Sequence, residues 1–173
     1  MFPINDEQGR VIGFSGRVLS AEAKAAKYVN SPETILFHKS RVFYGLDKAR
    51  REILEAKSAL VCEGQLDTMA CHMAGLKNVV APQGTALTAD HARILKRYTS
   101  EVVLCFDSDT AGQEAAVRSF DSLLESELAV RVMKVPSPHD PDSYIREQGV
   151  TAFCELMNAA PGFFDFYLSH LLS

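Results

Sequence analysis

The 173-residue sequence lacks the long apolar run and the leader that membrane and exported proteins carry. No apolar stretch approaches the roughly 18 residues that cross a bilayer. The first residues, Met1-Phe2-Pro3-Ile4, hold neither a basic n-region nor an apolar h-region, which argues against a secretory signal. The stretch up to Gly16 instead resembles a strand and turn entered partway, as in a piece of a longer protein. We therefore expect a cytoplasmic protein that does not contact a membrane.

Paired cysteines are also missing, because none of the four forms a CxxC motif. Cys62 and Cys105 fall inside apolar runs that predict buried strands, and reduced core thiols are typical of a cytoplasmic protein. The five histidines are scattered and show no zinc-ligand spacing. We expect no zinc in this chain. The four cysteines are Cys62, Cys71, Cys105 and Cys154.

Net charge is low, at −4, but it is unevenly distributed. Residues 1–57 contain ten Lys/Arg and seven Asp/Glu, which makes +3, and the remainder carries −7. A basic front and an acidic rear fit a protein that binds phosphates with one part and metal ions with the other. A chance asymmetry of solvated surfaces would look the same, so charge alone does not separate the two interpretations.

Hydrophobic residues make up 47% of the chain, enough for a packed core, and they recur in a βα pattern. Residues 2–20 predict two strands around a turn at 6–9. Residues 21–45 look irregular, with a loop at 28–32, and a helix is expected at 46–57. Short apolar strands are expected at 59–62, 78–81, 102–106 and 129–135. Helices are expected at 67–74, 89–98 (capped by Thr88) and 111–125.

Strands that alternate with helices predict an α/β fold with a parallel four-stranded sheet flanked by helices. The almost wholly apolar strands agree, because parallel strands are buried on both faces. A small, basic, mixed β/loop segment precedes the sheet, and an apolar helical tail follows it. We expect this tail to pack on the core or on a part of the protein outside this sequence. The predicted divisions are 1–45, 46–140 and 141–173.

Polar residues follow the carboxyl end of every predicted strand, where ligands gather in open α/β sheets. They are Glu63-Gly64, Gln83-Gly84-Thr85, Asp107-Ser108-Asp109 and, after a Pro-rich loop, Asp140-Pro141-Asp142. Converging carboxylates repel one another unless a proton or a divalent cation intervenes. Ligands that are all oxygen favour Mg²⁺ or Mn²⁺. Glu63, Asp107 and Asp109 are therefore the candidate metal ligands.

Each acid also has a simpler structural interpretation. Asp109 and Asp67 both precede or begin expected helices and could be N-caps, with Asp67 alternatively a supporting acid behind the metal ligands. Asp140 and Asp142 could form a polar turn and a helix start. Glu63 is harder to explain structurally, because an acid directly after a buried strand and before Gly64 is not needed for capping. We expect Gly64 to allow a sharp turn.

The joint pattern resembles the Toprim domain of bacterial-type primases, topoisomerases and some nucleases. It comprises Glu63-Gly64-Gln65-Leu66-Asp67 and Phe106-Asp107-Ser108-Asp109-Thr110-Ala111-Gly112. Further segments are similar to the basic segment that precedes Toprim in bacterial primases. These are Gly16-Arg17-Val18-Leu19, Lys27 to Thr34, Phe37-His38-Lys39 and Tyr44-Gly45-Leu46. Gln83 to Thr88 and Asp140-Pro141-Asp142 also fit. The resemblance covers about residues 3–150.

The primase resemblance implies metal-dependent joining of ribonucleotides on a single-stranded DNA template. Its catalytic residues would be Glu63, Asp107 and Asp109, holding two or more Mg²⁺ or Mn²⁺ ions, with Asp140 and Asp142 as further metal ligands. Partners would be ribonucleoside triphosphates, the RNA primer and, through a domain absent here, the replicative helicase. The location would be the bacterial cytoplasm, at the nucleoid.

The resemblance also implies nucleotide or template binding by Arg17, Lys27, Asn30 and Lys39, although each basic residue alone could be a solvated charge. Phe37, Phe43 and Tyr44 could stack on bases, but core packing is the commoner role of such aromatics.

Three other functions remain open on the sequence. A Toprim nuclease or topoisomerase fragment shares the acids but not the basic segment. A haloacid-dehalogenase-type phosphatase shares the pattern Asp107-Ser108-Asp109-Thr110, but carries it on the first strand. A non-catalytic nucleic-acid-binding module does not need the full set of acids.

Overall fold

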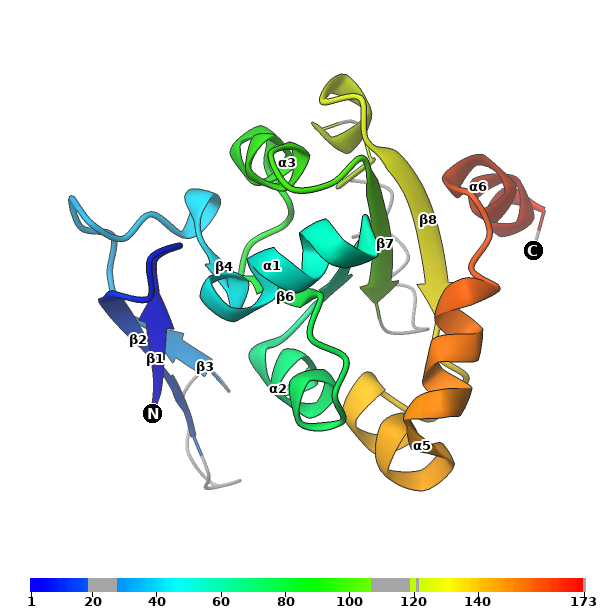
Figure 1. Ribbon diagram of the computed structural model, residues 1–173, viewed down its shortest axis with the longest axis horizontal. Coiled ribbons are helices and arrows are strands. Elements are labelled where there is room, and N and C mark those ends of the chain that lie inside the picture. Colours follow the sequence, from blue (N-terminus) through cyan, green and yellow to red (C-terminus); the bar gives the residue numbers. More distant parts are fainter. Residues whose placement is uncertain (19–27, 107–118, 121, 173) are drawn as a thin grey trace.

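The computed structural model describes residues 1–18, 28–106, 119–120 and 122–172 (Figure 1). The chain begins with a small antiparallel sheet in which β1 (Phe2–Asn5) and β2 (Val11–Arg17) form a hairpin. Its turn is stabilised by the Asp6 carboxylate, which accepts the N–H groups of Gln8 and Arg10. The two predicted strands and the turn at 6–9 are thereby confirmed.

The third strand of this sheet corrects the predicted loop at 28–32. Residues Tyr28–Asn30 form β3, which pairs antiparallel with β2. Pro32 prevents a helix, as its position indicates, but it leaves the residues before it extended and able to pair. The hydrogen bonds of β2 supply the stabilisation that a three-residue strand lacks by itself.

The main sheet has the order β4-β6-β5-β7-β8. Its strands are β4 (Phe43–Tyr44), β5 (Ala59–Cys62), β6 (Val79–Pro82), β7 (Glu101–Phe106) and β8 (Ala129–Lys134). Strands β5 to β8 are parallel, which confirms the predicted four-stranded sheet, while β4 adds an antiparallel edge beside β6. A two-residue strand has no readable hydrophobic period, so the sequence did not indicate β4.

Helices cover both faces of the main sheet (Figure 1). They are α1 (Leu46–Ala56), α2 (Gln65–Met73), α3 (Ala89–Lys96), α5 (Pro141–Asn158) and α6 (Phe163–Leu171), and residues 119–120 and 122–125 are also helical. A single-turn 3-10 helix, η1, spans Lys39–Arg41. The expected helices at 46–57 and 89–98 are confirmed, the latter with Thr88 as its N-cap. Most of the helix expected at 111–125 lies outside the described residues.

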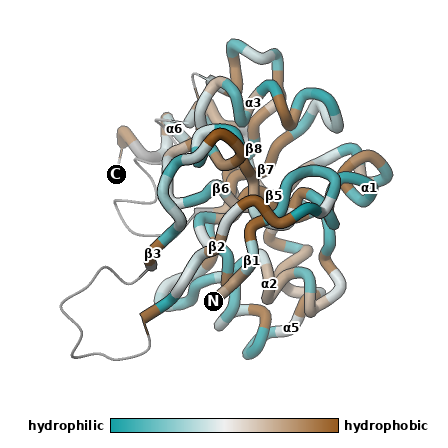
Figure 2. The backbone as a smooth tube through the Cα atoms, turned by 90° about the vertical axis from the view of Figure 1, so that its left-hand side faces the viewer, coloured by the Kyte–Doolittle hydropathy of each residue, from teal (hydrophilic) through white to brown (hydrophobic). Residues whose placement is uncertain are grey.

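Alternate residues along each strand point to opposite faces, which divides the core in two. Val61 and Leu104 pack with α1, α3 and α6, whereas Leu60 and Val103 pack with α2 and α5. All four side chains are fully buried. The hydrophobic, brown stretches in Figure 2 include these central strands. Burial on both faces explains why the strands read as continuous apolar runs.

The helical tail packs on this core, as one of the two expectations stated. Phe163 and Phe166 of α6 are buried against the sheet, and Gly162 makes an isolated antiparallel bridge to Arg131 of β8. The opposite face of α6 is exposed at Phe164, Leu168 and other apolar residues.

The cysteines of the described chain are free thiols, as predicted. Hydrogen bonds with Cys105 and Cys71, followed by burial, raise the pKa of the Cys62 thiol well above its usual value. A neutral, buried thiol is a poor nucleophile and metal ligand. These three side chains therefore serve as core residues between β5, β7 and α2.

Phe37 and Phe43 are also core residues, both almost completely buried. This supports the packing interpretation of these aromatics over base stacking.

Several hydrogen bonds join the small sheet and its following segment to the main sheet. Glu7, in the β1–β2 turn, accepts the Tyr98 hydroxyl at 2.6 Å and also pairs with Arg97 beyond α3. Asn5 Nδ2 donates to the Asp47 carboxylate of α1 at 3.0 Å. The two sheets are therefore held in one arrangement by side chains far apart in sequence.

His91 joins α3 to the segment before β4 and is fully buried. Its Nε2 lies 3.2 Å from the Val42 carbonyl oxygen, and its Nδ1 lies 3.3 Å from the Thr88 backbone nitrogen. A neutral ring satisfies both contacts, with a proton on Nε2 and a lone pair on Nδ1. Burial, the largest cause, lowers the pKa of His91.

We expect His91 to weaken the fold in mild acid. The pKa of His91 in the folded chain is below the unfolded value of about 6.5. As the pH falls through that value, the unfolded chain therefore binds a proton that the folded chain does not bind. The free energy of unfolding should therefore fall between pH 7.5 and 5.5. Urea unfolding of wild type and His91→Gln at both pH values measures this, and an equal pH dependence in the two proteins would contradict it.

Candidate active site at the carboxyl ends of the strands

The carboxyl ends of the parallel strands lie on one side of the main sheet, and Glu63 is located there. It follows Cys62, the last residue of β5, which is in register with Cys105 of the neighbouring strand β7. Glu63 is exposed, in contrast to the buried strand before it. The two other candidate ligands, Asp107 and Asp109, follow Phe106 at the end of β7 in the sequence and lie outside the described residues.

The turn after Glu63 differs in two respects from the expectation. Gly64 has φ −127° and ψ 162°, an extended conformation that any residue adopts, so no sharp left-handed turn is present. Its lack of a side chain matters for space instead, because a Cβ there would lie 3.0 Å from Asp67 Oδ2. Helix α2 begins at Gln65 with Gly64 as N-cap, so Asp67 lies in the first turn and is not itself the cap.

The first turn of α2 is nevertheless a favourable place for Asp67. Unpaired N–H groups and the helix dipole make that end of a helix electropositive. The Asp67 carboxylate folds back over Gly64, next to Glu63. Its role as a supporting acid stays a prediction.

A small cavity of about 100 Å³ opens beside Glu63 and is shared by both sheets. Asn30, at the end of β3, lines it together with Glu63, although 33 positions separate them in the sequence. Asn30 Nδ2 donates to the Gln83 carbonyl oxygen at 3.3 Å. Gly84 follows with φ +71°, and a Cβ there would approach Asn30 Nδ2 to 3.2 Å. The fold thus brings a predicted nucleotide-binding residue to a predicted catalytic acid.

Gln65 lines this cavity and Gln83 lies between two of its lining residues, Pro82 and Gly84. Both glutamines fall in segments that the sequence analysis noted, but neither was given a role there. Gln65, the first residue of α2, is 6% exposed, and Gln83, just after β6, is fully buried. Gln65 Nε2 donates to Gln83 Oε1 at 2.8 Å. The only sequence signal is that each follows a strand end, and their contact depends on β5 and β6 being neighbours.

Asp140 and Asp142 begin α5. The Asp140 carboxylate caps the helix by accepting the Ser143 N–H at 2.8 Å, and hydrogen bonds from the Ser143 side chain and backbone lower the pKa of Asp140. Asp142 pairs with Arg146 one turn on, at 3.1 Å. These contacts are the helix-start arrangement considered above. A role for these acids as metal ligands stays a prediction.

The predicted basic residues come from the small sheet and the segment after it. Arg17 is exposed at the end of β2, and Lys39 opens η1, where its backbone N–H donates to Glu33 at 2.9 Å. Lys27 lies outside the described residues.

One residue of the predicted metal-ligand set, Glu63, lies within the described part of the site at the strand ends. Among the described residues, no three His, Cys, Asp or Glu side chains gather closely enough to hold a metal ion. Glu63 offers an exposed carboxylate next to the end of β7, and the sequence continues there with two more carboxylates. Oxygen ligands of this kind fit Mg²⁺ or Mn²⁺.

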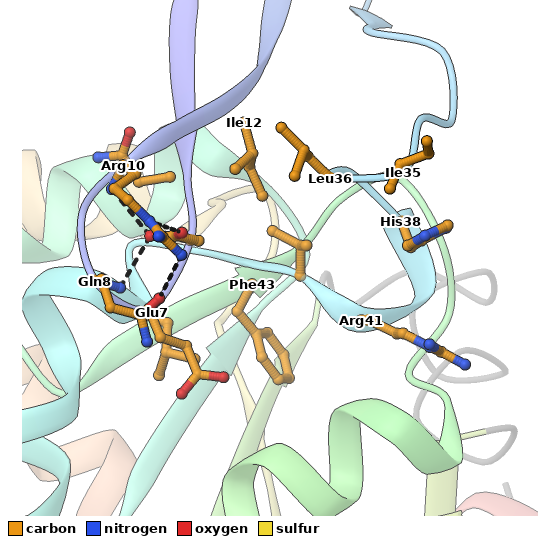
Figure 3. Close-up of a pocket in the computed structure, with 13 residues that line it drawn as sticks. Glu7, Gln8, Arg10, Ile12, Ile35, Leu36, His38, Arg41 and Phe43 are labelled. Atoms are coloured by element: carbon orange, nitrogen blue, oxygen red, sulfur yellow. Dashed lines mark hydrogen bonds and ion pairs between the residues drawn. The ribbon is translucent and has the colours of Figure 1, made fainter.

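A separate cavity of about 310 Å³ lies between the β1–β2 turn and residues 35–43 (Figure 3). It mixes apolar side chains, such as Ile12 and Leu36, with polar ones such as Arg10 and His38. Of the predicted catalytic and nucleotide-binding residues that the structure describes, none lines this cavity. None of the helices in the described ranges is long and apolar enough to cross a membrane.

The four parallel strands, flanked by helices and with an acid directly after β5, define the main domain as an α/β domain with a carboxylate at the strand ends. A family model described as Toprim-like matches residues 60–145. The chain belongs to the bacterial DNA primase family, since a model of the N-terminal domain of the DNA primase catalytic core also matches residues 1–50.

Individual relatives agree with this membership. The chain is 43% identical to a DNA primase of Clostridium acetobutylicum and 42% identical to one of Legionella pneumophila. These matches cover 98% and 99% of this chain but 28% and 30% of the relatives, so the chain spans under a third of their length. Its structure resembles the Escherichia coli primase catalytic core with a TM-score of 0.90 and 42% identity, over 99% of this chain and 55% of that one.

A further solved relative is described as a DnaG primase catalytic domain bound to single-stranded DNA. The similarity there has a TM-score of 0.85 and 42% identity, and it covers 93% of this chain and 52% of that one.

Proposed function

We propose that the chain forms part of the catalytic core of a DNA primase, which synthesises short RNA primers on single-stranded DNA by metal-dependent nucleotidyl transfer. The observation that carries this proposal is the cavity shared by Glu63 and Asn30. It places an acid suited to metal binding next to a residue of the small sheet suited to nucleotide binding. The family membership and the relative bound to single-stranded DNA support the same chemistry.

Glu63, Asp107 and Asp109 hold the catalytic divalent ions in this proposal. Two divalent ions bound by these carboxylates would supply activation of the attacking 3′ hydroxyl and charge stabilisation of the departing pyrophosphate. Asp67, at the start of α2, supports Glu63 through its place over Gly64. Asp140 and Asp142, at the start of α5, complete or adjoin the metal site in this proposal.

Arg17, Lys27 and Lys39 neutralise phosphates of the triphosphate or the template, and Asn30 hydrogen-bonds the nucleotide. Cationic donors next to an acidic metal site offset the negative charge that accumulates during nucleotidyl transfer.

The proposed division of labour follows three segments. Residues 1–45 provide the basic groups, 46–140 the Toprim metal site, and 141–173 the helical support. The replicative helicase binds a domain outside this chain, and the protein acts in the bacterial cytoplasm.

The test measures template-directed RNA synthesis by an Asp107→Ala/Asp109→Ala double variant. The variant is made in a protein that has the full length of the primases this chain resembles. Synthesis should require Mg²⁺ or Mn²⁺ and should be abolished in the double variant, while circular dichroism shows an unchanged fold. A Glu155→Ala/Asp165→Ala double variant, altered at two exposed acids of α5 and α6, is the matched control and should retain synthesis. Synthesis by the folded site variant defeats the mechanism, and plasmid nicking without synthesis favours a Toprim nuclease.

A further inference from the structure

The cavity beside Glu63 is surrounded by buried polar atoms without hydrogen-bond partners. Seven such side-chain atoms occur in the described residues, and four belong to residues in or next to the cavity lining. Those four atoms are Asn30 Oδ1, Gln65 Oε1, Gln83 Nε2 and Thr85 Oγ1. Buried polar groups are nearly always paired, so a concentration of unpaired ones marks a place where another molecule supplies the partner.

The Gln65–Gln83 pair defines what that partner must offer. One hydrogen bond joins the two amides, which leaves an acceptor on Gln65 and a donor on Gln83. Turning both amides by 180° exchanges the two roles but still leaves one donor and one acceptor. A hydroxyl group both donates and accepts, so a single hydroxyl satisfies both amides.

The charge and size of the cavity favour a hydroxyl over a phosphate. The described residues that line it include no Lys or Arg, and Glu63 adds a negative charge at its rim. A phosphate acts chiefly as an acceptor, so it would pair with the Gln83 donor but leave the Gln65 acceptor unpaired, whether or not a metal ion is bound at Glu63. The volume of about 100 Å³ is roughly three times the ~30 Å³ share of one water molecule in the liquid, enough for the hydroxyl edge of a sugar.

The two glutamines are positioned at the cavity by the elements that carry them. Gln65 opens α2 and lines the cavity, and Gln83 is flanked by Pro82 and Gly84, which both line it. Asn30 accepts no hydrogen bond through Oδ1 but donates to the Gln83 main chain, so it holds the strand end that carries Gln83.

We propose that Gln65 and Gln83 bind a ribose hydroxyl of the nucleotide and make this enzyme select ribonucleotides. The inference rests on the proposed function and extends it to the basis of sugar selection. The Gln65 amide presents its oxygen to the hydroxyl, and the Gln83 amide donates to the hydroxyl oxygen. A nucleotide that lacks the hydroxyl leaves both amides unpaired in a buried site, which weakens its binding.

The test compares ATP, 2′-deoxy-ATP and 3′-deoxy-ATP, bound in the presence of Mg²⁺ and measured by calorimetry. Wild type should bind ATP about tenfold more tightly than one of the two deoxy analogues. The analogue that binds more weakly shows whether the 2′ or the 3′ hydroxyl of the ribose contacts the two glutamines. A Gln65→Leu/Gln83→Leu double variant should bind ATP and that analogue equally. Gln148→Leu, at an exposed position of α5, is the matched control and should discriminate as wild type does.

Two further measurements separate binding from folding. The double variant should melt at the same temperature as wild type or higher, because it removes two incompletely paired buried amides. The side-chain NH₂ resonances of Gln83, assigned by comparison with the variant, should shift on addition of ATP and not on addition of the weak analogue.

The outcomes are distinguishable. Equal binding of all three nucleotides by wild type overturns sugar selection and leaves the proposed function intact. If the double variant is stable and still binds ATP more tightly than the weak analogue, the two amides pair only with water. That result also overturns sugar selection by Gln65 and Gln83. Failure of wild type to bind ATP at all, together with absence of RNA synthesis, defeats the proposed function and the inference with it.

Discussion

Glu63→Gln is expected to reduce primer synthesis by about 100- to 1,000-fold, in line with the loss of one preorganised electrostatic contact in an active site. The amide keeps the shape of the side chain but removes its charge from the metal site. Glu63 is exposed at the end of β5, so the substitution leaves the buried strand unchanged. Synthesis of labelled primers at several Mg²⁺ concentrations measures the effect, and Mg²⁺ binding should weaken in parallel.

The control is Glu55→Gln, which removes an equal charge from an exposed ion pair with Arg51 on α1. Its rate should match wild type, because exposed ion pairs contribute little to stability and this one lies away from the strand ends. If Glu63→Gln synthesises primers at the wild-type rate when Mg²⁺ is limiting, Glu63 is not a metal ligand.

Leu104→Ala is expected to lower the free energy of unfolding by about 2–5 kcal/mol, the usual range for a buried leucine. Leu104 is fully buried in β7, between β5 and β8, and Asp107 follows three residues later. The loss is a large part of the 5–15 kcal/mol that stabilises a typical domain. Because β7 carries the chain to the proposed ligands, metal binding should weaken with the fold. Urea unfolding and the melting temperature measure the change.

Leu54→Ala removes the same atoms from an exposed position of α1, where Leu54 is 53% exposed. That change should alter stability by no more than about 0.5 kcal/mol, as for most surface substitutions. Equal losses in the two variants would mean that β7 is not the tightly packed centre of the sheet.

The sequence predicted the four parallel strands and α3 because their signals are local. Each strand is a short apolar run closed by polar residues, and Thr88 is a strong N-cap before a periodic helix. The two-strand hairpin was equally visible, since a polar turn with Gly9 separates its strands. Such features depend on residues that are close together in the chain.

The short strands β3 and β4 could not be predicted in the same way. They contain three and two residues, and each is extended because a partner strand binds it. The start of α2 was placed two residues late because Asp67 is a strong capping residue type, whereas Gly64 is a weaker signal. Space near Asp67, not backbone freedom, accounts for the glycine.

The same distinction between local and long-range features applies to the candidate site. Local patterns were sufficient to identify Glu63, Asp107 and Asp109 as carboxylates that follow strands, and to suggest an oxygen-rich metal site. The pairing of β5 with β7 and β6, the contact of Asn30 with the Gln83 main chain, and the buried Gln65–Gln83 pair came only with the tertiary structure. The reason is physical: hydrophobic runs specify that strands form, but the order of strands in a sheet depends on long-range packing, and that order decides which side chains meet.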